Sequence, residues 1–450
     1  MTSGNTRTYR SLFDQGVYTA MLIEFSVSNF RSIKEEQTLT MIADSGKLKL
    51  ENTFMPEDNN KLKLLKSSVI YGANASGKTN IIKAFSALNA FILSSSKLDI
   101  DDPIFCYDPF AFDESYRTAP SHFKIIFLGT DNIKYDYDIS FDRKKVISEI
   151  LNFYPKGRKA NLFIRTNAHK EVILGSKYFS DKKEVPKKVL DNHLYLSEIG
   201  NSPHKQMSEI YKYFKNRIKI GNLINESICK KQMLETLMQQ DNIKLKKKLD
   251  KFIKIADTQI NGISITERKE HEFPIPMGNM PQDLKHEIFR QNRYKIESLH
   301  EIYKNGESLE EPACFNFDEE SKGTRTLYAL GGLILEKFAT GGVVFFDELE
   351  NSLHPKLCKF IVKLFHYSES NPKNVQLIFS THETTLLDKE LFRKDQIWIT
   401  EKNRFGGTEL FSVTDFEGLP SDIPFEQWYM KGKFGGLPNI KEIQFIFGEE

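Results

Sequence analysis

The sequence has few cysteines and lacks any long apolar run. Its four cysteines, Cys106, Cys229, Cys314 and Cys358, lie far apart and form no C-x-x-C pair, which argues against a zinc site and a disulfide framework. Such cysteine usage fits a reducing, cytoplasmic setting. No stretch is apolar for long enough to span a bilayer, and the N-terminus lacks the apolar segment of a secretory signal. We therefore expect a cytoplasmic protein with no membrane partner.

An excess of charge of one sign is also missing, because 63 basic residues nearly balance 61 acidic residues and leave a net charge of +2. This balance argues against a dedicated nucleic-acid coat, while a local basic patch stays open. The 450 residues can bury a large core in two or three lobes. Residues 1–20 are polar and without pattern, so we interpret them as a flexible tail, with Met21 as an alternative start of the chain.

What the sequence does contain is a phosphate-binding motif, G-x-x-x-x-G-K-[ST]. An apolar run at 69–71 precedes it and a helical pattern follows, which is the strand, loop and helix context that this motif needs. Glycines let backbone N–H groups face a phosphate chain, and the helix dipole adds positive potential there. We expect ATP and Mg²⁺ as cofactors, with Lys78 on the β- and γ-phosphates and Thr79 on the metal. The binding residues of the motif are Gly72, Ala73, Asn74, Ala75, Ser76, Gly77, Lys78 and Thr79.

A strand pattern and a short polar turn precede this loop. Residues 23–27 alternate apolar and polar, Asn29-Phe30-Arg31-Ser32 follows, and a second strand-like piece covers 37–42. An opening strand that ends in N-F-[RK]-S, followed by a loop of the form G-x-N-x-[SA]-G-K-[ST], resembles the RecF/SMC/OLD-like branch of ABC-type ATPases. In that branch the basic residue of the opening turn lies near the nucleotide. The resemblance therefore implies a nucleotide contact for Arg31, and a surface arginine at a strand end is the alternative.

Three strand-like runs follow at 123–128, 134–141 and 146–154, with Asp-Asn and Asp-Arg turn signals between them. They predict an antiparallel meander, which corresponds to the β-subdomain of ABC ATPases. That family usually places a glutamine near this subdomain to sense Mg²⁺ and the γ-phosphate. No glutamine occurs between the phosphate-binding loop and Gln206, so the residue that replaces it is open, with His122 as a candidate.

A helical pattern occupies about 203–258, with an apolar face and a Lys-rich face. The segment is too short for the long coiled coils of SMC proteins, so 201–260 is predicted to be a helical insertion that packs on the core or pairs with another subunit. Strand-like patterns at 260–266 and 294–303 predict that the chain then returns to the core. The Lys-rich stretch 156–190 is interpreted as a solvated loop and helix face, with a polyanion-binding patch as the alternative. The apolar helix face comprises Leu245, Leu249, Phe252, Ile253 and Ala256.

The second half of the sequence carries further residues that such an ATPase needs. Ser321-Lys322-Gly323-Thr324 precedes a helical pattern and offers a hydroxyl and free N–H groups to an anion. It resembles the ABC signature in its S-x-G-T form. The resemblance implies that Ser321 and Gly323 bind the γ-phosphate held on another subunit's loop, and an ordinary helix cap is the alternative.

Two apolar strand patterns end in candidate catalytic residues. The run 343–346 ends in Asp347 and Glu348, and adjacent acids at a buried strand end are costly unless they have a chemical task. We expect Asp347 to reach Mg²⁺ through water, and Glu348 to orient or deprotonate the attacking water. The run from Gln376 ends in His382, which resembles the ABC switch histidine that contacts the γ-phosphate and this water. A structural histidine is the alternative.

The remaining motifs indicate a subgroup. E-N-x-L-H-P at 350–355 is typical of the RecF-like and OLD-like branch, and D-Q-I-W, E-L-F-S and F-G-G-x-P-N-I near the C-terminus resemble the AAA-fifteen group of bacterial ABC-type ATPases. The predicted fold is therefore α/β, an ABC-type P-loop ATPase with an antiparallel β-subdomain and a helical insertion. Its N-terminal lobe would cover 21–200 and its C-terminal lobe 261–450. Because two ABC subunits close head to tail around ATP, the resemblance implies ATP hydrolysis by a homo-oligomer.

The resemblance also implies an output for this hydrolysis. Members of the AAA-fifteen group are often the ATPase subunit of two-gene bacterial anti-phage systems, with the effector nuclease on a separate protein. The chain would then control a separate Toprim-like nuclease and respond to a phage-encoded trigger protein, since too few residues follow His382 for a nuclease domain of its own. The alternative is a RecF/SMC-like DNA-repair ATPase that binds DNA. A transporter ATPase would need a membrane partner and, normally, the missing glutamine.

Overall fold

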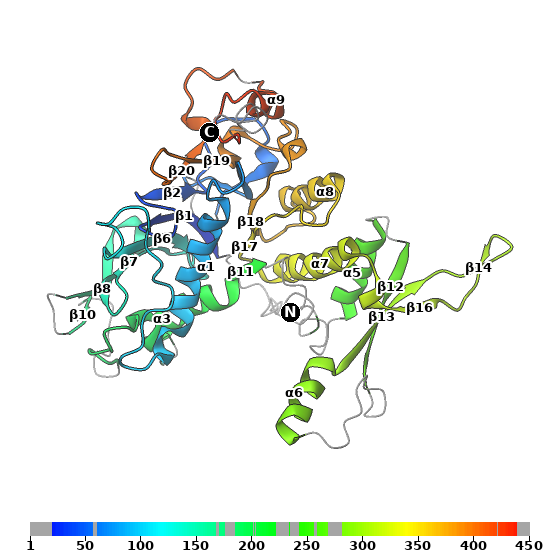
Figure 1. Cartoon of the computed structure of the whole chain (residues 1–450), viewed down its shortest axis with the longest axis horizontal. Helices are drawn as coiled ribbons and strands as arrows, with labels where there is room; N and C mark the ends of the chain where they lie inside the picture. Colours follow the sequence, from blue (N-terminus) through cyan, green and yellow to red (C-terminus); the bar gives the residue numbers. More distant parts are fainter. Residues whose placement is uncertain are drawn as a thin grey trace, which may run out of the picture.

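The computed structural model describes most of the chain. The predicted tail at 1–20 lies outside the described residues except for Ala20, and so does Ala256 of the predicted helix face. Figure 1 shows two sheets with helices between and beside them, and an arm that projects from the rest. The described residues are 20–56, 61–167, 171–175, 185–200, 202, 204–221, 234, 243–255, 259–268, 281–420 and 422–438.

A six-stranded sheet forms the centre of the core, in the order β11-β17-β18-β5-β19-β20. Neighbouring strands are parallel except for β20, which pairs antiparallel with β19 and confirms the hairpin that the sequence predicts. The three central strands are buried along their whole length, as strands of a parallel sheet covered on both faces must be. In sheet order the strands are Ile218–Gly221, Val343–Phe346, Gln376–Ser380, Ser67–Gly72, Ile397–Lys402 and Thr408–Ser412.

Helices cover both faces of this sheet. Successive residues of a strand point to opposite faces, so Val343 and Phe345 join the core around α1, whereas Val344 and Phe346 join the core around α7 and α8. Phe85 of α1 stacks on Phe345 with ring centroids 4.0 Å apart. The three helices are α1 (Lys78–Ser94), α7 (Lys322–Thr340) and α8 (Pro355–His366).

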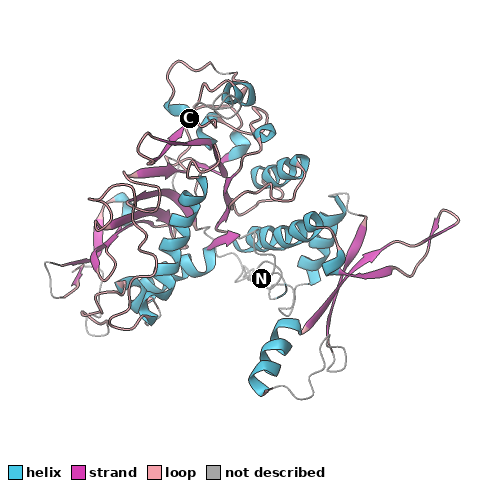
Figure 2. Ribbon diagram, viewed as in Figure 1, coloured by secondary structure: helices cyan, strands magenta, loops and turns pink. Residues whose placement is uncertain are grey.

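The second large sheet is antiparallel, in the order β10-β9-β8-β7-β6-β1-β2, and lies on the other side of α1 (Figure 2). It confirms the predicted meander, because β6, β7 and β8 pair in sequence order. The two strands predicted at the start of the chain complete it beside β6. The strands are β1 (Met21–Ser28), β2 (Gln37–Thr40), β6 (Ser121–Leu128), β7 (Lys134–Phe141), β8 (Val146–Phe153), β9 (Ala160–Thr166) and β10 (Ile173–Leu174).

Short elements complete the core. Two helices and a π-helical turn pack around α1, and a last helix packs near the end of the described chain. None of the helices within the described ranges is long and apolar enough to cross a membrane. These elements are β3 (Thr53–Phe54), β4 (Leu64–Leu65), α2 (Tyr195–Ile199), α3 (Lys205–Lys212), the π-helix Tyr213–Arg217 and α9 (Phe425–Met430).

The projecting arm differs from the sequence prediction in its sheet. The strands predicted at 260–266 and 294–303 exist, and Ile260, Ile263 and Ile296 pack in the core around α7 and α8, but the strands join neither of the two large sheets. They pair with each other, and β13 also pairs with β16, in a separate three-stranded sheet. Alternation of apolar residues encodes a strand but not its partner, and here the partner lies within the arm itself. The arm comprises α5 (Ile243–Ile255), β12 (Ile260–Glu267), α6 (Gln282–Asn292), β13 (Tyr294–His300), β14 (Tyr303–Lys304), β15 (Glu307–Ser308) and β16 (Ala313–Asn316).

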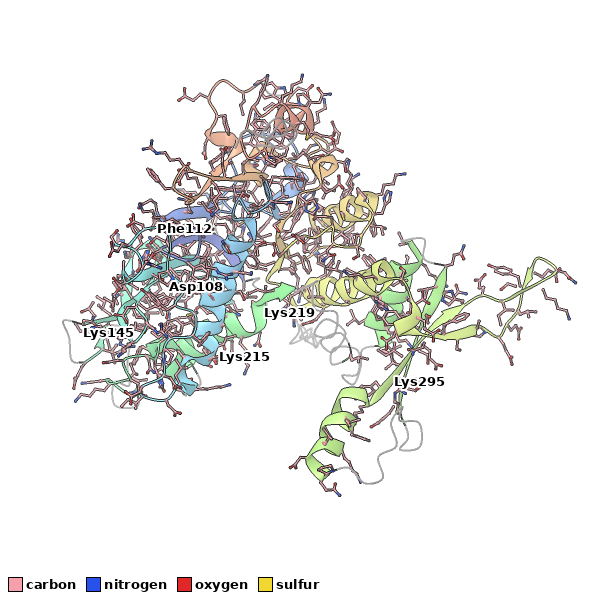
Figure 3. All side chains as sticks on the ribbon, viewed as in Figure 1. Asp108, Phe112, Lys145, Lys215, Lys219 and Lys295 are labelled. Carbon is pink, nitrogen blue, oxygen red and sulfur yellow. The ribbon has the colours of Figure 1, made fainter. Side chains whose placement is uncertain are left out.

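Helix α5 joins the arm to the core. Its predicted apolar face is buried at Leu249, Phe252 and Ile253, and packs on α7. The two helices meet closely, because a Cβ atom added to Gly331 of α7 would lie 2.6 Å from the ring of Phe252. In Figure 3, Lys219 marks β11 near the middle of the molecule and Lys295 marks β13 in the arm. The arm thus begins at α5 and continues beyond residue 260, where the sequence predicts the end of the helical insertion.

Candidate active site

The phosphate-binding loop connects β5 to α1, as predicted. Gly72 ends the strand, and Gly77 caps the helix with φ 117°, a conformation that favours glycine. A Cβ atom at Gly77 would lie 2.2 Å from Oγ1 of Thr408, so no side chain fits there. Ala75 is also left-handed, with φ 63°. The loop therefore curls so that backbone N–H groups are available at the start of a long helix.

Lys78 lies inside this curl. Its side chain is buried, with the residue 7% exposed, and Nζ donates to the carbonyl oxygens of Gly72 at 2.7 Å and Ala73 at 3.1 Å. Burial lowers the pKa of Lys78, while the carboxylates of Glu350, Glu348 and Asp347 oppose this shift. The acids that follow β17 thus act on the charge of Lys78.

A cluster of oxygen atoms joins the loop to the end of β17. The Thr79 hydroxyl donates to Oδ1 of Asp347 at 3.2 Å, and the Ser380 hydroxyl donates to the same oxygen. The Ser380 oxygen also accepts the N–H of Glu348 at 2.9 Å, so it holds both acids in place. A hydroxyl and a carboxylate are ligands that Mg²⁺ accepts, and here they already meet. The predicted metal residues, Thr79 and Asp347, therefore fit this ion.

Glu348 follows with a left-handed backbone, φ 53°. This conformation is uncommon for a residue with a side chain, and such residues concentrate at functional sites. The turn after it is fixed, since Asn351 N–H donates to the Glu348 carbonyl at 2.9 Å. The strained turn directs the chain back across the edge of the sheet, toward His382.

His382 follows β18 and is 59% exposed at its side chain. Its backbone N–H donates to Oε1 of Glu350 at 2.8 Å, and its ring Nδ1 lies 2.9 Å from the same oxygen. The preceding residue, Thr381, donates its N–H to the Ile70 carbonyl on β5. The predicted switch histidine thus belongs to the same sheet edge as Lys78, Asp347 and Glu348.

Ser321 lies at the N-terminus of α7 and caps it, because its hydroxyl oxygen accepts the N–H of Thr324 at 3.1 Å. The residue is exposed, and within the described residues no hydrogen bond or ion pair joins it to the phosphate-binding loop. Gly323 lies beside the chain that follows Glu350, since an added Cβ would be 2.7 Å from the carbonyl oxygen of Ser352. The structure therefore does not bring the predicted signature to the loop of the same chain.

Arg31 lies in the opening turn with φ 54°. Its backbone N–H donates to the carbonyl of Asp108 at 2.6 Å, and its Nε lies 2.9 Å from the carboxylate of Asp108, which Figure 3 labels. The next residue, Ser32, ties the turn to α1, because its hydroxyl accepts Nδ2–H of Asn80 at 2.6 Å. Arg31 therefore reaches the phosphate-binding loop only indirectly, through the contact of Ser32 with Asn80. Its guanidinium group pairs with the exposed carboxylate of Asp108.

Several residues that support the loop have no counterpart in the sequence prediction. The Thr408 hydroxyl donates to the Ser76 carbonyl at 2.9 Å, and the Thr400 hydroxyl lies 2.6 Å from that of Ser76. Both threonines lie on the hairpin β19–β20, and an isolated threonine in a strand pattern gives no signal of such a role. Ser380 and Glu350 were also missed, although each lies within two residues of a predicted site residue.

His122, the candidate replacement for the missing glutamine, lies on β6. Its Nε2 is 3.0 Å from Oδ1 of Asp138 on β7, and this hydrogen bond raises the pKa of His122 despite its burial. Its Nδ1 lies 3.6 Å from Glu36. Its observed partners are therefore neighbouring acids of the antiparallel sheet, and none of them belongs to the phosphate-binding loop.

Comparisons with known proteins agree with this arrangement. The family model AAA_21, described as "AAA domain, putative AbiEii toxin, Type IV TA system", matches residues 67–388. Among curated protein sequences no match is found.

Solved structures to which the chain is similar include two SMC head domains and RecF. The SMC head domain from Thermotoga maritima is 12% identical, with a TM-score of 0.38, and the match covers 87% of this chain and 98% of that one. The recombination mediator protein RecF with ATP is 15% identical, with a TM-score of 0.37 and coverage of 88% and 99%. An Smc head domain from Pyrococcus furiosus, with an extended coiled coil and bound to the C-terminal domain of ScpA, is 13% identical, with a TM-score of 0.36 and coverage of 87% and 96%.

The fold, with its phosphate-binding loop, parallel sheet and antiparallel subdomain, is that of an ABC-type P-loop ATPase. The subgroup that the C-terminal residues resemble, AAA-fifteen, stays a prediction. Because the matching model covers well over half of the sequence, the chain belongs to the AAA_21 family.

Proposed function

We propose that the chain hydrolyses ATP. The observation that supports this most is the meeting of the phosphate-binding loop with Asp347, Glu348 and His382 at the carboxyl ends of three neighbouring strands. Each of these residue types suits one task of phosphoryl transfer to water. Asp347 and Glu348 share the Ser380 hydroxyl as a partner, and His382 follows two residues after that serine.

The geometry suggests how the steps divide among the residues. Backbone N–H groups of the loop bind the phosphate chain, and Lys78 exchanges its two bonds to loop carbonyls for phosphate oxygens. Its charge then offsets the charge that develops on the transferred phosphoryl group. Glu348 orients the attacking water and accepts its proton, and His382 holds the water in line from the neighbouring strand.

Thr79 and Asp347 would hold Mg²⁺, since their oxygens already lie together. When bound, this ion would neutralise part of the charge on the phosphates. The chain's own contribution is to keep Asp347 in position, through the Ser380 hydroxyl that also holds Glu348.

A second copy of the chain would complete the site. Ser321 and Gly323 lie at an exposed helix N-terminus away from the loop of their own chain, and such an N-terminus favours an anion. A head-to-tail homodimer would bring this N-terminus to the γ-phosphate held by the other copy. Loss of the γ-phosphate on hydrolysis would then weaken the pairing, which makes the assembly a nucleotide switch.

We further propose that this switch acts in a bacterial anti-phage defence system in the cytoplasm. The description of the matching family as a putative AbiEii toxin of a toxin–antitoxin system supports a defence role. By resemblance the chain is most like AriA, the ATPase subunit of the PARIS system. It would serve as sensor and scaffold, hold a separate Toprim-like nuclease, and respond to a phage-encoded trigger protein.

The hydrolysis is tested by phosphate release from ATP and Mg²⁺ with the purified chain. Glu348→Gln should keep ATP binding and lose turnover, because an amide cannot accept the proton of the water. Lys78→Ala should lose binding as well, which separates the two roles. Unchanged turnover in the Glu348→Gln variant would contradict the assignment.

The defence role is tested by co-purification with the product of a neighbouring nuclease gene, in the presence and absence of ATP. A stable complex of the chain with the nuclease, whose formation depends on ATP, would support the proposal. If the nuclease does not bind, and duplex DNA instead stimulates the ATPase, the chain acts as a DNA-repair ATPase of the RecF/SMC-like type.

A further inference from the structure

Phe112 is an exposed aromatic side chain for which the mechanism above has no task. It lies in the segment between α1 and β6, and Figure 3 labels it together with Asp108 of the same segment. The residue is 75% exposed, although burial of a phenyl ring is among the larger stabilising contributions that one side chain makes. Single exposed apolar side chains are common on protein surfaces, so the position of this ring, and not its exposure alone, indicates its role.

The ring is held in a fixed position. Phe110, which is buried, meets it edge to face, with ring centroids 5.6 Å apart and an angle of 89° between the ring planes. The backbone N–H of Phe110 donates to Oδ1 of Asn29 in the opening turn at 2.9 Å. The ring of Phe112 also lies against Gly406, where an added Cβ atom would be 2.9 Å from ring carbon Cδ2. Phe112 is therefore an exposed ring on a firm support.

Gly406 connects this ring to the phosphate-binding loop. It lies in the turn between β19 and β20, two residues before Thr408. The Thr408 hydroxyl donates to the Ser76 carbonyl at 2.9 Å, and its side chain leaves no room for a Cβ atom at Gly77. Because two residues of chain span at most about 7 Å, the ring of Phe112 lies close to the loop.

The order of the strands decides on which side of the loop a nucleoside lies. β5 ends in the loop, with β18 and β17 on one side of it and β19 and β20 on the other. The γ-phosphate must point to the side of β17 and β18, because Asp347, Glu348 and His382 follow those two strands. The nucleoside then leaves the loop on the side of β19 and β20, which is the side of Phe112.

The chemistry of Phe112 suits a nucleobase. An aromatic ring stacks on a base without any hydrogen bond, because every base has a π face. The other exposed aromatic ring at this turn belongs to Phe405, and the guanidinium carbon of Arg404 lies over it, 4.5 Å from the centroid. No cation of the described part of the chain lies over the ring of Phe112 in this way. Of the two rings, Phe112 is therefore the one that is open to a ligand.

We propose that Phe112 stacks on the purine base of the bound nucleotide, so that the segment between α1 and β6 forms part of the nucleotide-binding site. This inference rests on the proposed binding of ATP. The ring contributes to the affinity for the nucleotide and takes no part in phosphoryl transfer. Inorganic pyrophosphate, which carries the two phosphates of ADP but no base, binds the loop without contacting Phe112.

Calorimetric titration of the purified chain with ADP and with pyrophosphate, both in the presence of Mg²⁺, tests this role without the complication of hydrolysis. Phe112→Ala should weaken the binding of ADP by roughly 5- to 150-fold, the effect of removing one ring that stacks on a base. The binding of pyrophosphate should not change. If the variant weakens both ligands equally, Phe112 shapes the loop and the inference is overturned.

Phe105→Ala is the matched control, because Phe105 belongs to the same segment and is 52% exposed. Its ring meets Phe91 in the last turn of α1, at the far end of the helix from the phosphate-binding loop, with ring centroids 6.2 Å apart. This variant should bind ADP as the wild-type chain does, and Phe112→Tyr, which keeps the ring, should bind within a few-fold of it. Equal losses in Phe105→Ala and Phe112→Ala would contradict stacking.

A tryptophan in place of the ring reports the contact directly, whether or not Phe112→Ala folds. ADP should quench the fluorescence that Phe112→Trp adds to that of the wild-type chain, and pyrophosphate should not. Bound ADP that leaves this fluorescence unchanged would overturn the inference, as would a Phe112→Ala variant that keeps its affinity for ADP and loses only self-association. If ADP quenches the tryptophan but the wild-type chain releases no phosphate from ATP, the proposed hydrolysis fails and the role of Phe112 stands.

Discussion

The stability of the ATPase core should fall as the pH drops below about 6.5, because His366 is buried in its neutral form. His366 ends α8, is 3% exposed, and its Nε2 lies 2.8 Å from the Ser67 hydroxyl on β5. Burial, together with the nearby lysines Lys66, Lys49 and Lys363, lowers the pKa of His366 to about 3. Protonation of this ring is therefore far easier in the unfolded chain.

The sign and size of the effect follow from this difference. Since the folded-state pKa lies below the unfolded value of about 6.5, the unfolded chain binds more protons throughout the window between them. The contribution of His366 to the free energy of unfolding is fully present above pH 6.5 and is lost as the pH falls toward 3. Well below pH 6.5 each pH unit removes about 1.4 kcal/mol, and because half of the unfolded-state rings are already protonated at pH 6.5, acidification from pH 6.5 to 4.5 should remove about 2.3 kcal/mol.

Urea unfolding at both pH values, followed by tryptophan fluorescence, measures this loss. The chain has two tryptophans: Trp398 on β19 lies in the core around α1, and Trp428 on α9 packs against the core around α7 and α8, so together they report on unfolding of both faces of the sheet. His366→Gln keeps a polar group near Ser67 but cannot titrate, so its stability should depend less on pH.

His122→Gln is the matched control with the opposite sign. Hydrogen bonding to Asp138 raises the pKa of His122, so its contribution is present at low pH and is lost as the pH rises through that raised value. The His122→Gln variant should therefore lose more free energy of unfolding than the wild-type chain when the pH falls from 6.5 to 4.5. If the wild-type chain and the His366→Gln variant lose the same free energy between pH 6.5 and 4.5, the reasoning about His366 is refuted.

Three further substitutions test the packing of the site and the arm. Ser380→Ala removes the hydroxyl that holds both acids of β17, so kcat should fall by roughly 10-fold or more while nucleotide binding, measured by fluorescence of a labelled ATP, stays. Gly77→Ala should abolish ATP binding, because its Cβ has no room; Gly418→Ala, which is also left-handed but open, is the control and should bind normally. Gly331→Val should destabilise the contact of α7 with Phe252 by about 1–3 kcal/mol and speed proteolysis of the arm; unchanged cleavage would show that this close approach does not matter.

The sequence predicts a site residue where a suitable side chain stands at the end of a short, recognisable strand or helix pattern. Lys78 lies in a motif that only a strand, loop and helix accommodate, and the geometry confirms that context. Asp347 and His382 each follow an apolar run, and such runs became the central strands. In each case a pattern of a few residues determines both the element and the position of the polar group at its end.

The residues that were missed depend on pairing between distant segments. Thr408 supports the loop only because β19 pairs with β5 and β20 pairs with β19, although these strands lie more than 300 residues from β5 in sequence. Glu350 lies in a turn whose left-handed start at Glu348 no local pattern indicates. The separate sheet of the arm could not be predicted for the same reason, since apolar alternation at 260–266 does not encode which strand is the partner.

The order of the central strands explains why the site exists at all. β17, β18 and β5 are neighbours, and their register aligns Phe346 with Phe379 and Ser380 with Ile70, so the residues after each strand meet at one edge. This order is stabilised by the buried apolar faces on α1, α7 and α8, not by contacts among the polar groups. Packing of the core therefore offsets the entropy that is lost when Thr79 and Asp347 are brought together, and it does so before any nucleotide binds. In this way a rigid fold preorganises a catalytic site. The N-terminus of α7 lies outside this alignment, and under the proposed function that is why one chain alone cannot complete the site.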